Sequence, residues 1–299
     1  MKNLFLFFAM LFASVVSSYA HPAWGIEVDR HRNVYFADIS HNGMGTVWKL
    51  SAKGELTALL KDFHAHNVNL DKNGLPVAAH GEEGNNLFIR VLPDSTTETI
   101  IREADWDRFF GGNAFYSKRG NIYFAMKGIW QIKPGGERIR FNDHEFKWIQ
   151  SMYVDDEEFV YAVDKAVDNG TLYRLSGNGS VEVLASGLIT KTSEPVDLHD
   201  VTLLGITKGC EGRIYVTESV GRRVVRIESG KTFTTVYRSA ENWFPTGVDM
   251  FAGDLYVLEY GRKENNKGPR ISRIDESGRV SILFELGSGI GARNAIEVR

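Results

Sequence analysis

The chain has 299 residues, a formal net charge of −3 and a hydrophobic fraction of 43%. A charge this close to zero lacks the basic excess typical of nucleic-acid-binding proteins, so we expect no nucleic-acid partner. The single cysteine, Cys210, cannot form an internal disulfide, and the composition is that of a folded globular protein. Length alone permits one large domain or two average ones.

The first twenty residues have the pattern of a secretory signal peptide. Lys2 gives a short positive region, residues 4–16 form an almost unbroken apolar run, and Ser18-Tyr19-Ala20 matches the small-x-small cleavage pattern. The run is too short to cross a bilayer, and no later segment approaches about 18 apolar residues. We therefore expect removal of residues 1–20, no membrane span, and a mature protein of residues 21–299 that is secreted or periplasmic.

A strand pattern recurs six times through residues 21–299. An apolar-aromatic segment is followed by a second segment, and the last apolar residue of this second segment falls at positions 50, 91, 132, 175, 227 and 274. Turn residues and a further strand, such as residues 280–283, complete each copy. Four short strands in each of six copies predict an all-β fold, a six-bladed β-propeller with four antiparallel strands per blade. One closed ring makes residues 21–299 a single domain, and residues 293–299 are a candidate for closing it.

The first copy carries a recognisable motif. Residues 25–29 read Gly-Ile-x-Val-Asp, and residues 33–38 read Asn-Val-Tyr-x-Ala-Asp. This pattern resembles the repeat of NHL and SMP-30/gluconolactonase-like propellers. The resemblance covers the mature chain and implies a fold rather than one activity, because such folds host unrelated functions.

In a propeller the first strand of each blade lines the central tunnel, and the second strand returns beside it. The start of the first strand and the end of the second therefore lie at the same end, which we call the mouth. The first strands are expected to begin at Trp24-Gly25, His66-Asn67, Gly112-Asn113, Gln150-Ser151, His199-Asp200 and Thr246-Gly247. This alignment requires an insertion of about five residues in the fifth blade, which we place at residues 208–212. The second strands are expected to end at Asp38, His80, Met126, Asp164, Glu218 and Glu259.

Histidines are concentrated at the mouth. Seven of the eight map there or to its loops, namely His21, His41, His64, His66, His80, His144 and His199. Imidazoles and carboxylates near one axis are typical ligands of a metal that activates water or polarises a carbonyl. The predicted metal ligands are His66, His80 and His199, and the expected cofactor is a divalent metal, zinc or calcium, with copper a further candidate. The predicted substrate-binding residues are Trp24, Asn67, Asn113 and Asp200, and the acid/base candidates are Glu218 and Glu259.

Structural roles are the alternative for the same residues. Acidic residues end the second strand in four of six blades, which is also typical of groups that cap loop N–H donors. His64 and His144 fit exposed loop positions. His66 and His199 lie three blades apart, so one ion reaches both only across a narrow tunnel.

Two families resemble parts of this pattern. SMP-30-like lactonases hold an axial metal with Glu, Asn and Asp, and Asn67, Asn113 and Asp200 occupy comparable positions; the Gly-Glu-Gly-Pro, Pro-Asn-Gly and Pro-Asp-Gly motifs of that family are missing here. Peptidyl-hydroxyglycine amidating lyases place zinc histidines much as His66 and His199 are placed. These resemblances imply a metal-dependent hydrolase or lyase, a monomer acting on a small-molecule or peptide substrate. The alternative is a non-catalytic propeller that binds a protein, peptide or glycan.

Overall fold

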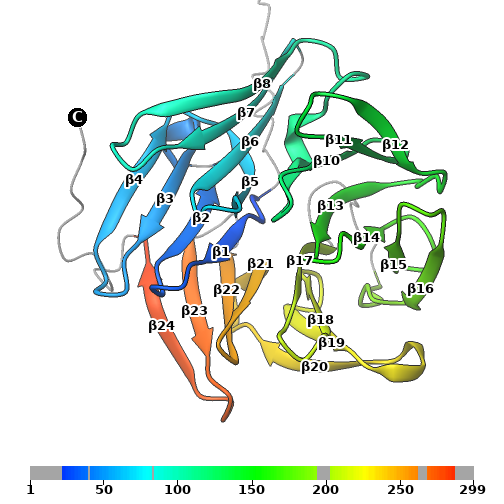
Figure 1. Cartoon of the computed structure of the whole chain (residues 1–299). Coiled ribbons are helices and arrows are strands. Elements are labelled where there is room, and N and C mark those ends of the chain that lie inside the picture. Colours follow the sequence, from blue (N-terminus) through cyan, green and yellow to red (C-terminus); the bar gives the residue numbers. More distant parts are fainter. Residues whose placement is uncertain (1–21, 40, 83, 194–202, 262–267, 287–299) are drawn as a thin grey trace, which may run out of the picture.

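Six four-stranded antiparallel sheets surround a central axis in the computed structural model (Figure 1). The structure describes residues 22–39, 41–82, 84–193, 203–261 and 268–286. Each sheet consists of four strands consecutive in the sequence, so the predicted six-bladed propeller is confirmed. Across these described residues, no helix is long and apolar enough to cross a membrane. The expected signal peptide and the tail at 293–299 lie outside the described residues.

The first three blades occupy the amino-terminal half of the chain. Blade one contains β1 (Ile26–Val28), β2 (Val34–Asp38), β3 (Thr46–Leu50) and β4 (Leu56–Lys61). Blade two contains β5 (Ala65–Leu70), β6 (Pro76–Glu82), β7 (Asn85–Val91) and β8 (Thr97–Glu103). Blade three contains β9 (Phe115–Tyr116), β10 (Ile122–Ala125), β11 (Ile129–Ile132) and β12 (Arg138–Asn142).

The other three blades complete the ring. Blade four contains β13 (Ile149–Val154), β14 (Val160–Asp164), β15 (Thr171–Leu175) and β16 (Val181–Ala185). Blade five contains β17 (Leu203–Lys208), β18 (Ile214–Glu218), β19 (Arg223–Ile227) and β20 (Phe233–Arg238). Blade six contains β21 (Trp243–Phe251), β22 (Asp254–Gly261), β23 (Arg270–Ile274) and β24 (Val280–Glu285). The short 3-10 turns are η1 (His41–Gly43), η2 (Gly111–Asn113) and η3 (Ser229–Lys231).

The third strand of every blade ends at the residue that the repeat predicted. These residues are Leu50, Val91, Ile132, Leu175, Ile227 and Ile274. The second strands β2, β10, β14 and β18 are buried along their whole length, because each sheet packs between two neighbours and both of its faces are covered.

Blade six packs directly against blade one and closes the ring (Figure 1). Phe36 of β2 lies 5.8 Å from Phe284 of β24, measured between ring centroids. The Tyr260 hydroxyl in β22 donates a 3.0 Å hydrogen bond to the Ala37 carbonyl in β2. Apolar packing and a hydrogen bond therefore join the first and last described blades.

The inner strand of blade five corrects the predicted alignment. Ile206 pairs with Val216, and Lys208 pairs with Ile214, which leaves the same five-residue hairpin loop as in blade one. No insertion is needed, and residues 204–205 occupy the ring position of Trp24-Gly25. The alignment that placed His199-Asp200 there is wrong, because it followed the likeness to His66-Asn67 instead of the hairpin length. His199 and Asp200 themselves lie outside the described residues.

Candidate functional site at the tunnel mouth

The inner strands approach one another so closely that the central tunnel is narrow. A Cβ atom on Gly25 would lie 2.2 Å from the Val68 nitrogen, and one on Gly247 would lie 2.4 Å from the Trp24 oxygen. The amides of Trp24 and Gly25 both donate to the His66 carbonyl, which joins blade one to blade two. The axial cavity measures about 20 Å³, enough for one or two water molecules. This cavity therefore has no room for a larger ligand.

One layer of the tunnel is formed by the inner-strand residues that pair with the repeated tyrosine position of the second strand, which is Val77 in blade two. These residues are Glu27, Asn69, Phe115, Tyr153, Thr207 and Asp249. Glu27 and Asp249 line the same cavity, and neither acid was predicted from the sequence as a site residue. The pairing register of the first and second strands would have identified these two acids. Each lies opposite the repeated tyrosine, Tyr35 in blade one and Tyr256 in blade six.

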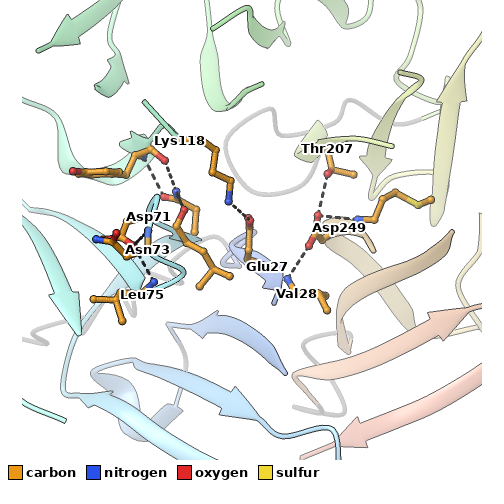
Figure 2. A network of polar contacts seen from close by, with 12 residues as sticks. Glu27, Val28, Asp71, Asn73, Leu75, Lys118, Thr207 and Asp249 are labelled. Carbon is orange, nitrogen blue, oxygen red and sulfur yellow. Dashed lines mark hydrogen bonds and ion pairs between the residues drawn. The ribbon is translucent and has the colours of Figure 1, made fainter. Parts of the chain in front are cut away.

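The two axial carboxyl groups have different partners (Figure 2). Asp249 accepts hydrogen bonds from the Val28 amide (2.8 Å), the Met250 amide (2.8 Å) and the Thr207 hydroxyl (3.1 Å). Glu27 has the Lys118 ammonium group at 4.0 Å as its ion-pair partner, and that lysine is half exposed. Both carboxyl groups line the cavity, but only the hydrogen bonds of Asp249 connect blades five, six and one.

Burial raises the pKa values of both axial carboxyl groups. Burial, together with the nearby Asp249 charge, raises the pKa of Glu27 to about 8, and Lys118 opposes that increase. Burial also raises the pKa of Asp249, to about 6, although its three hydrogen-bond donors favour the charged form. Both carboxyl groups are therefore harder to ionise than ordinary acids, because burial disfavours their charged forms.

Three histidines of blade two gather at the mouth. The Nε2 atoms of His64 and His66 lie 3.3 Å apart and share a hydrogen bond, and we call these two residues the imidazole pair. The Nδ1 atom of His80 lies 3.0 Å from the His64 carbonyl oxygen. The Trp24 ring stacks on the His66 ring at 5.3 Å with an interplanar angle of 21°. His64, which the sequence had suggested to be an exposed loop residue, is half-buried within this group.

The imidazole pair has the spacing of two metal ligands. Zinc–nitrogen bonds of about 2.0–2.1 Å at a tetrahedral angle place two nitrogens about 3.3–3.4 Å apart. Across the part of the chain that the structure describes, no three His, Cys, Asp or Glu side chains form a complete ligand group. The pair therefore offers two adjacent ligand positions, and His21 and His199 lie outside the described residues.

The predicted substrate-binding asparagines bond to backbone. Asn67 Nδ2 donates to the Ala114 carbonyl (3.0 Å), which joins blade two to blade three. Both ends of the Asn113 amide pair with the Ala125 backbone, its Nδ2 donating at 2.9 Å and its Oδ1 accepting at 3.0 Å. Trp24 is buried and lines the axial cavity as well as contacting His66. The roles of these residues toward a substrate stay predictions.

Glu218 and Glu259 are fully buried at the ends of β18 and β22. Glu218 accepts from Arg223 Nε (2.9 Å), the Thr190 hydroxyl (2.6 Å) and the Gly221 amide (3.0 Å). Glu259 accepts from Arg270 Nε at 2.9 Å and from the Tyr237 hydroxyl at 3.1 Å. The Gly221 amide makes Glu218 a loop cap, the structural alternative for this position, whereas Glu259 is bound by side chains of β20 and β23. All of these contacts come from blades five and six and the connection before blade five, whereas the imidazole pair belongs to blade two.

Exposed aromatic side chains also occur on the mouth side. Trp106 and Trp148 are 39% and 40% exposed, and both lie in connections that lead from an outer strand to the next inner strand. Met44, 55% exposed, follows η1 in the loop between β2 and β3 at the same end. Among the described residues, the other large exposed apolar side chains are Val181 and Val280. Both valines follow hairpins at the opposite end, so the exposed aromatic area belongs to the mouth side.

Sequence comparisons with known proteins do not assign this chain to a family. No family model matches the chain. The 3-isopropylmalate dehydratase large subunit of Lactococcus lactis subsp. cremoris (strain SK11) is 25% identical over 166 residues, 50% of this chain. The matched part is 34% of that enzyme, so the chain spans about a third of its length. A match this short and this distant assigns no family.

Solved propellers match over most of the chain. A virginiamycin B lyase from Staphylococcus aureus superposes with a TM-score of 0.57 at 14% identity, covering 87% of this chain and 83% of the lyase. A gluconolactonase from Xanthomonas campestris has a TM-score of 0.57 at 13% identity, covering 80% and 83%. TolB from Acinetobacter baumannii has a TM-score of 0.57 at 14% identity, covering 79% and 58%. The expected likeness to gluconolactonase-like propellers is therefore confirmed at the level of the fold.

Proposed function

We propose that the protein is a metal-dependent hydrolase or lyase that acts on a small molecule or peptide at the tunnel mouth. The observation that carries this proposal is the 3.3 Å separation between the Nε2 atoms of His64 and His66. Two imidazole nitrogens at this distance suit zinc, which prefers nitrogen ligands in a tetrahedral arrangement. A bound zinc ion would supply Lewis acidity toward a carbonyl or lower the pKa of a bound water.

The architecture supports a site at the mouth. The axial cavity has room for one or two waters, so a substrate carbonyl would approach the imidazole pair from outside. Trp106 and Trp148 offer apolar surface at the same end of the molecule. Related folds carry a gluconolactonase and a virginiamycin B lyase, one hydrolytic and one eliminating activity by name, which is why both reaction types are kept.

His199 and Asp200 stay in the proposal as candidates from the sequence alone. The same holds for Glu218 and Glu259 as acid or base. Secretion or a periplasmic location and a monomeric state are likewise proposed from the sequence. The lone cysteine can form no internal disulfide, so a secreted form of this protein would depend on packing between its blades for stability.

A non-catalytic binding propeller is the second candidate. The exposed Trp106 and Trp148 rings favour it, because exposed aromatic side chains gathered on one face mark interaction sites. This alternative needs no metal at the imidazole pair, so metal content separates the two functions.

The test is the metal content of the purified protein, before and after reloading with zinc. We expect about one metal per chain for the wild type and a loss of metal in His66→Ala. His31→Ala is the matched control, since His31 is exposed in the β1–β2 hairpin loop at the opposite end. Wild-type protein that takes up no zinc, or a His66→Ala variant that keeps the full content, would overturn the proposed function. Hydrolysis of gluconolactone and cleavage of virginiamycin B are the first activities to assay, since the similar structures include a gluconolactonase and a virginiamycin B lyase.

A further inference from the structure

We infer that the Lys118 side chain is a strap across the end of the tunnel opposite the mouth, held by the ionised Glu27 carboxylate and released when that carboxylate is protonated. The Lys118 ammonium group lies 4.0 Å from the Glu27 carboxylate (Figure 2). Lys118 belongs to the β9–β10 hairpin of blade three and Glu27 to β1 of blade one. Blade two separates these blades in the ring, so the ion pair spans the tunnel end instead of joining neighbouring blades.

The backbone that carries Lys118 is fixed from both neighbouring blades. The Asn69 side chain of blade two bonds twice to the Tyr116 backbone, its Nδ2 donating to the carbonyl at 2.7 Å and its Oδ1 accepting from the amide at 3.3 Å. On the other side, the Ser117 hydroxyl donates to Glu158 Oε1 of blade four at 2.6 Å. These anchors hold the hairpin in place, which leaves the flexible Lys118 side chain as the part that moves.

Titratable groups from three further positions face the Glu27 carboxyl. They are Asp249 of β21, Tyr153 of β13 and Asp156 of the β13–β14 hairpin. Burial and the negative charges of Asp249 and Asp156 raise the pKa of Glu27 to about 8. The Lys118 ammonium opposes this increase, so it favours the charged carboxylate. As pH falls through about 8, Glu27 takes up a proton and the strap loses its partner.

The ion pair is weak enough to open. The Lys118 side chain is 51% exposed and the Glu27 side chain 21% exposed, so water screens their attraction. An ion pair of this kind shifts an equilibrium by about 2–5-fold. Glu27 also lines the axial cavity, which has room for one or two waters. We therefore expect the charge of Glu27 to set how readily water in this cavity exchanges with solvent at the end opposite the mouth.

Methyl signals of the lysines report the ion pair directly. Reductive methylation with carbon-13 keeps the positive charge of each lysine and makes the group visible by NMR. We expect the Lys118 signal, identified by its loss in Lys118→Arg, to shift with a midpoint near pH 8 in the wild type and not in Glu27→Gln. Lys72, exposed in the β5–β6 hairpin loop at the same end, is the internal control and should not respond in this range.

Hydrogen exchange tests whether the strap limits the access of water. The Val28 and Met250 amides donate to Asp249 beside the cavity, so their exchange reports water that enters there. At pH 9 we expect both amides to exchange about 2–5-fold faster in Lys118→Ala than in Lys72→Ala. At pH 5 the two variants should exchange at equal rates, because a protonated carboxyl no longer holds the strap.

Three results would overturn the strap. The first is a Lys118 signal that does not change with pH, or that shifts alike in the wild type and Glu27→Gln. The second is equal exchange of the Val28 and Met250 amides in Lys118→Ala and Lys72→Ala at pH 9. The third is an equal acceleration in the buried strand β14 of blade four, which would mean a global loss of stability. None of these readouts involves a metal, so failure of the strap is distinguishable from failure of the proposed function.

Discussion

Glu27 of the first inner strand and Asp249 of the last one face a single axial cavity at the junction where the ring closes. Asp249 is bound by donors from blades one, five and six, whereas Glu27 lies 4.0 Å from the half-exposed Lys118. Like charges in a space for one or two waters repel strongly when both are ionised.

The stability of the fold is expected to fall as pH rises. The pKa of Glu27 is raised from its ordinary 4.5 to about 8, so between these values the folded chain binds a proton that the unfolded chain has released. The stabilisation is present below pH 4.5 and lost as pH rises through about 8. Denaturant melts across this range should show the decline for the wild type. Glu27→Gln should flatten it and raise stability at pH 9 by on the order of 2 kcal/mol; a wild-type slope retained in Glu27→Gln would contradict the assignment.

The two axial acids should be energetically coupled. At pH 9 the single variants Glu27→Gln and Asp249→Asn each remove one side of the repulsion, so the double variant should gain less than the sum of the two. We expect a coupling free energy of about 1–2 kcal/mol from this double-mutant cycle. At pH 4 the coupling should vanish because Glu27 is protonated. Additive effects at pH 9 would show that the two groups do not interact across the cavity.

Gly25 should tolerate no side chain. Its conformation is open to any residue, but an added Cβ would lie 2.2 Å from the Val68 nitrogen, so Gly25→Ala has to push blade one away from blade two. We expect a loss of about 3 kcal/mol in the free energy of unfolding. Gly135→Ala is the matched control, since nothing lies within 4 Å of its added Cβ. Equal stability of the two variants would disprove the close approach.

The buried ion pair of Glu259 should matter for stability. Glu259→Ala leaves the Arg270 guanidinium buried with its carboxylate removed, and we expect a loss of about 3–5 kcal/mol. Glu137→Ala, which breaks an exposed pair with Lys133 at 2.8 Å, should cost at most about 1 kcal/mol. Thermal and denaturant melts measure both. Turnover per folded molecule of Glu259→Gln then tests the acid/base role predicted from the sequence.

The repeat was predictable because it is a local property. Alternating apolar residues and turn signals placed the end of each third strand at the observed residue, from Leu50 to Ile274. The inner strands were harder, since short strands such as Ile26–Val28 carry little pattern. In blade five the motif likeness of His199-Asp200 outweighed the regular hairpin length, and the register of Ile206 opposite Val216 corrected it.

The sequence by itself determined the six four-stranded units and their order, because both follow from periodicity along the chain. Only the tertiary structure decided which side chains meet. Glu27 and Asp249 are more than 200 residues apart in sequence and share one cavity only because the ring closes. His66 likewise contacts both His64 of its own blade and the Trp24 ring of the neighbouring blade. Contacts between blades are set by packing, and no local pattern encodes them.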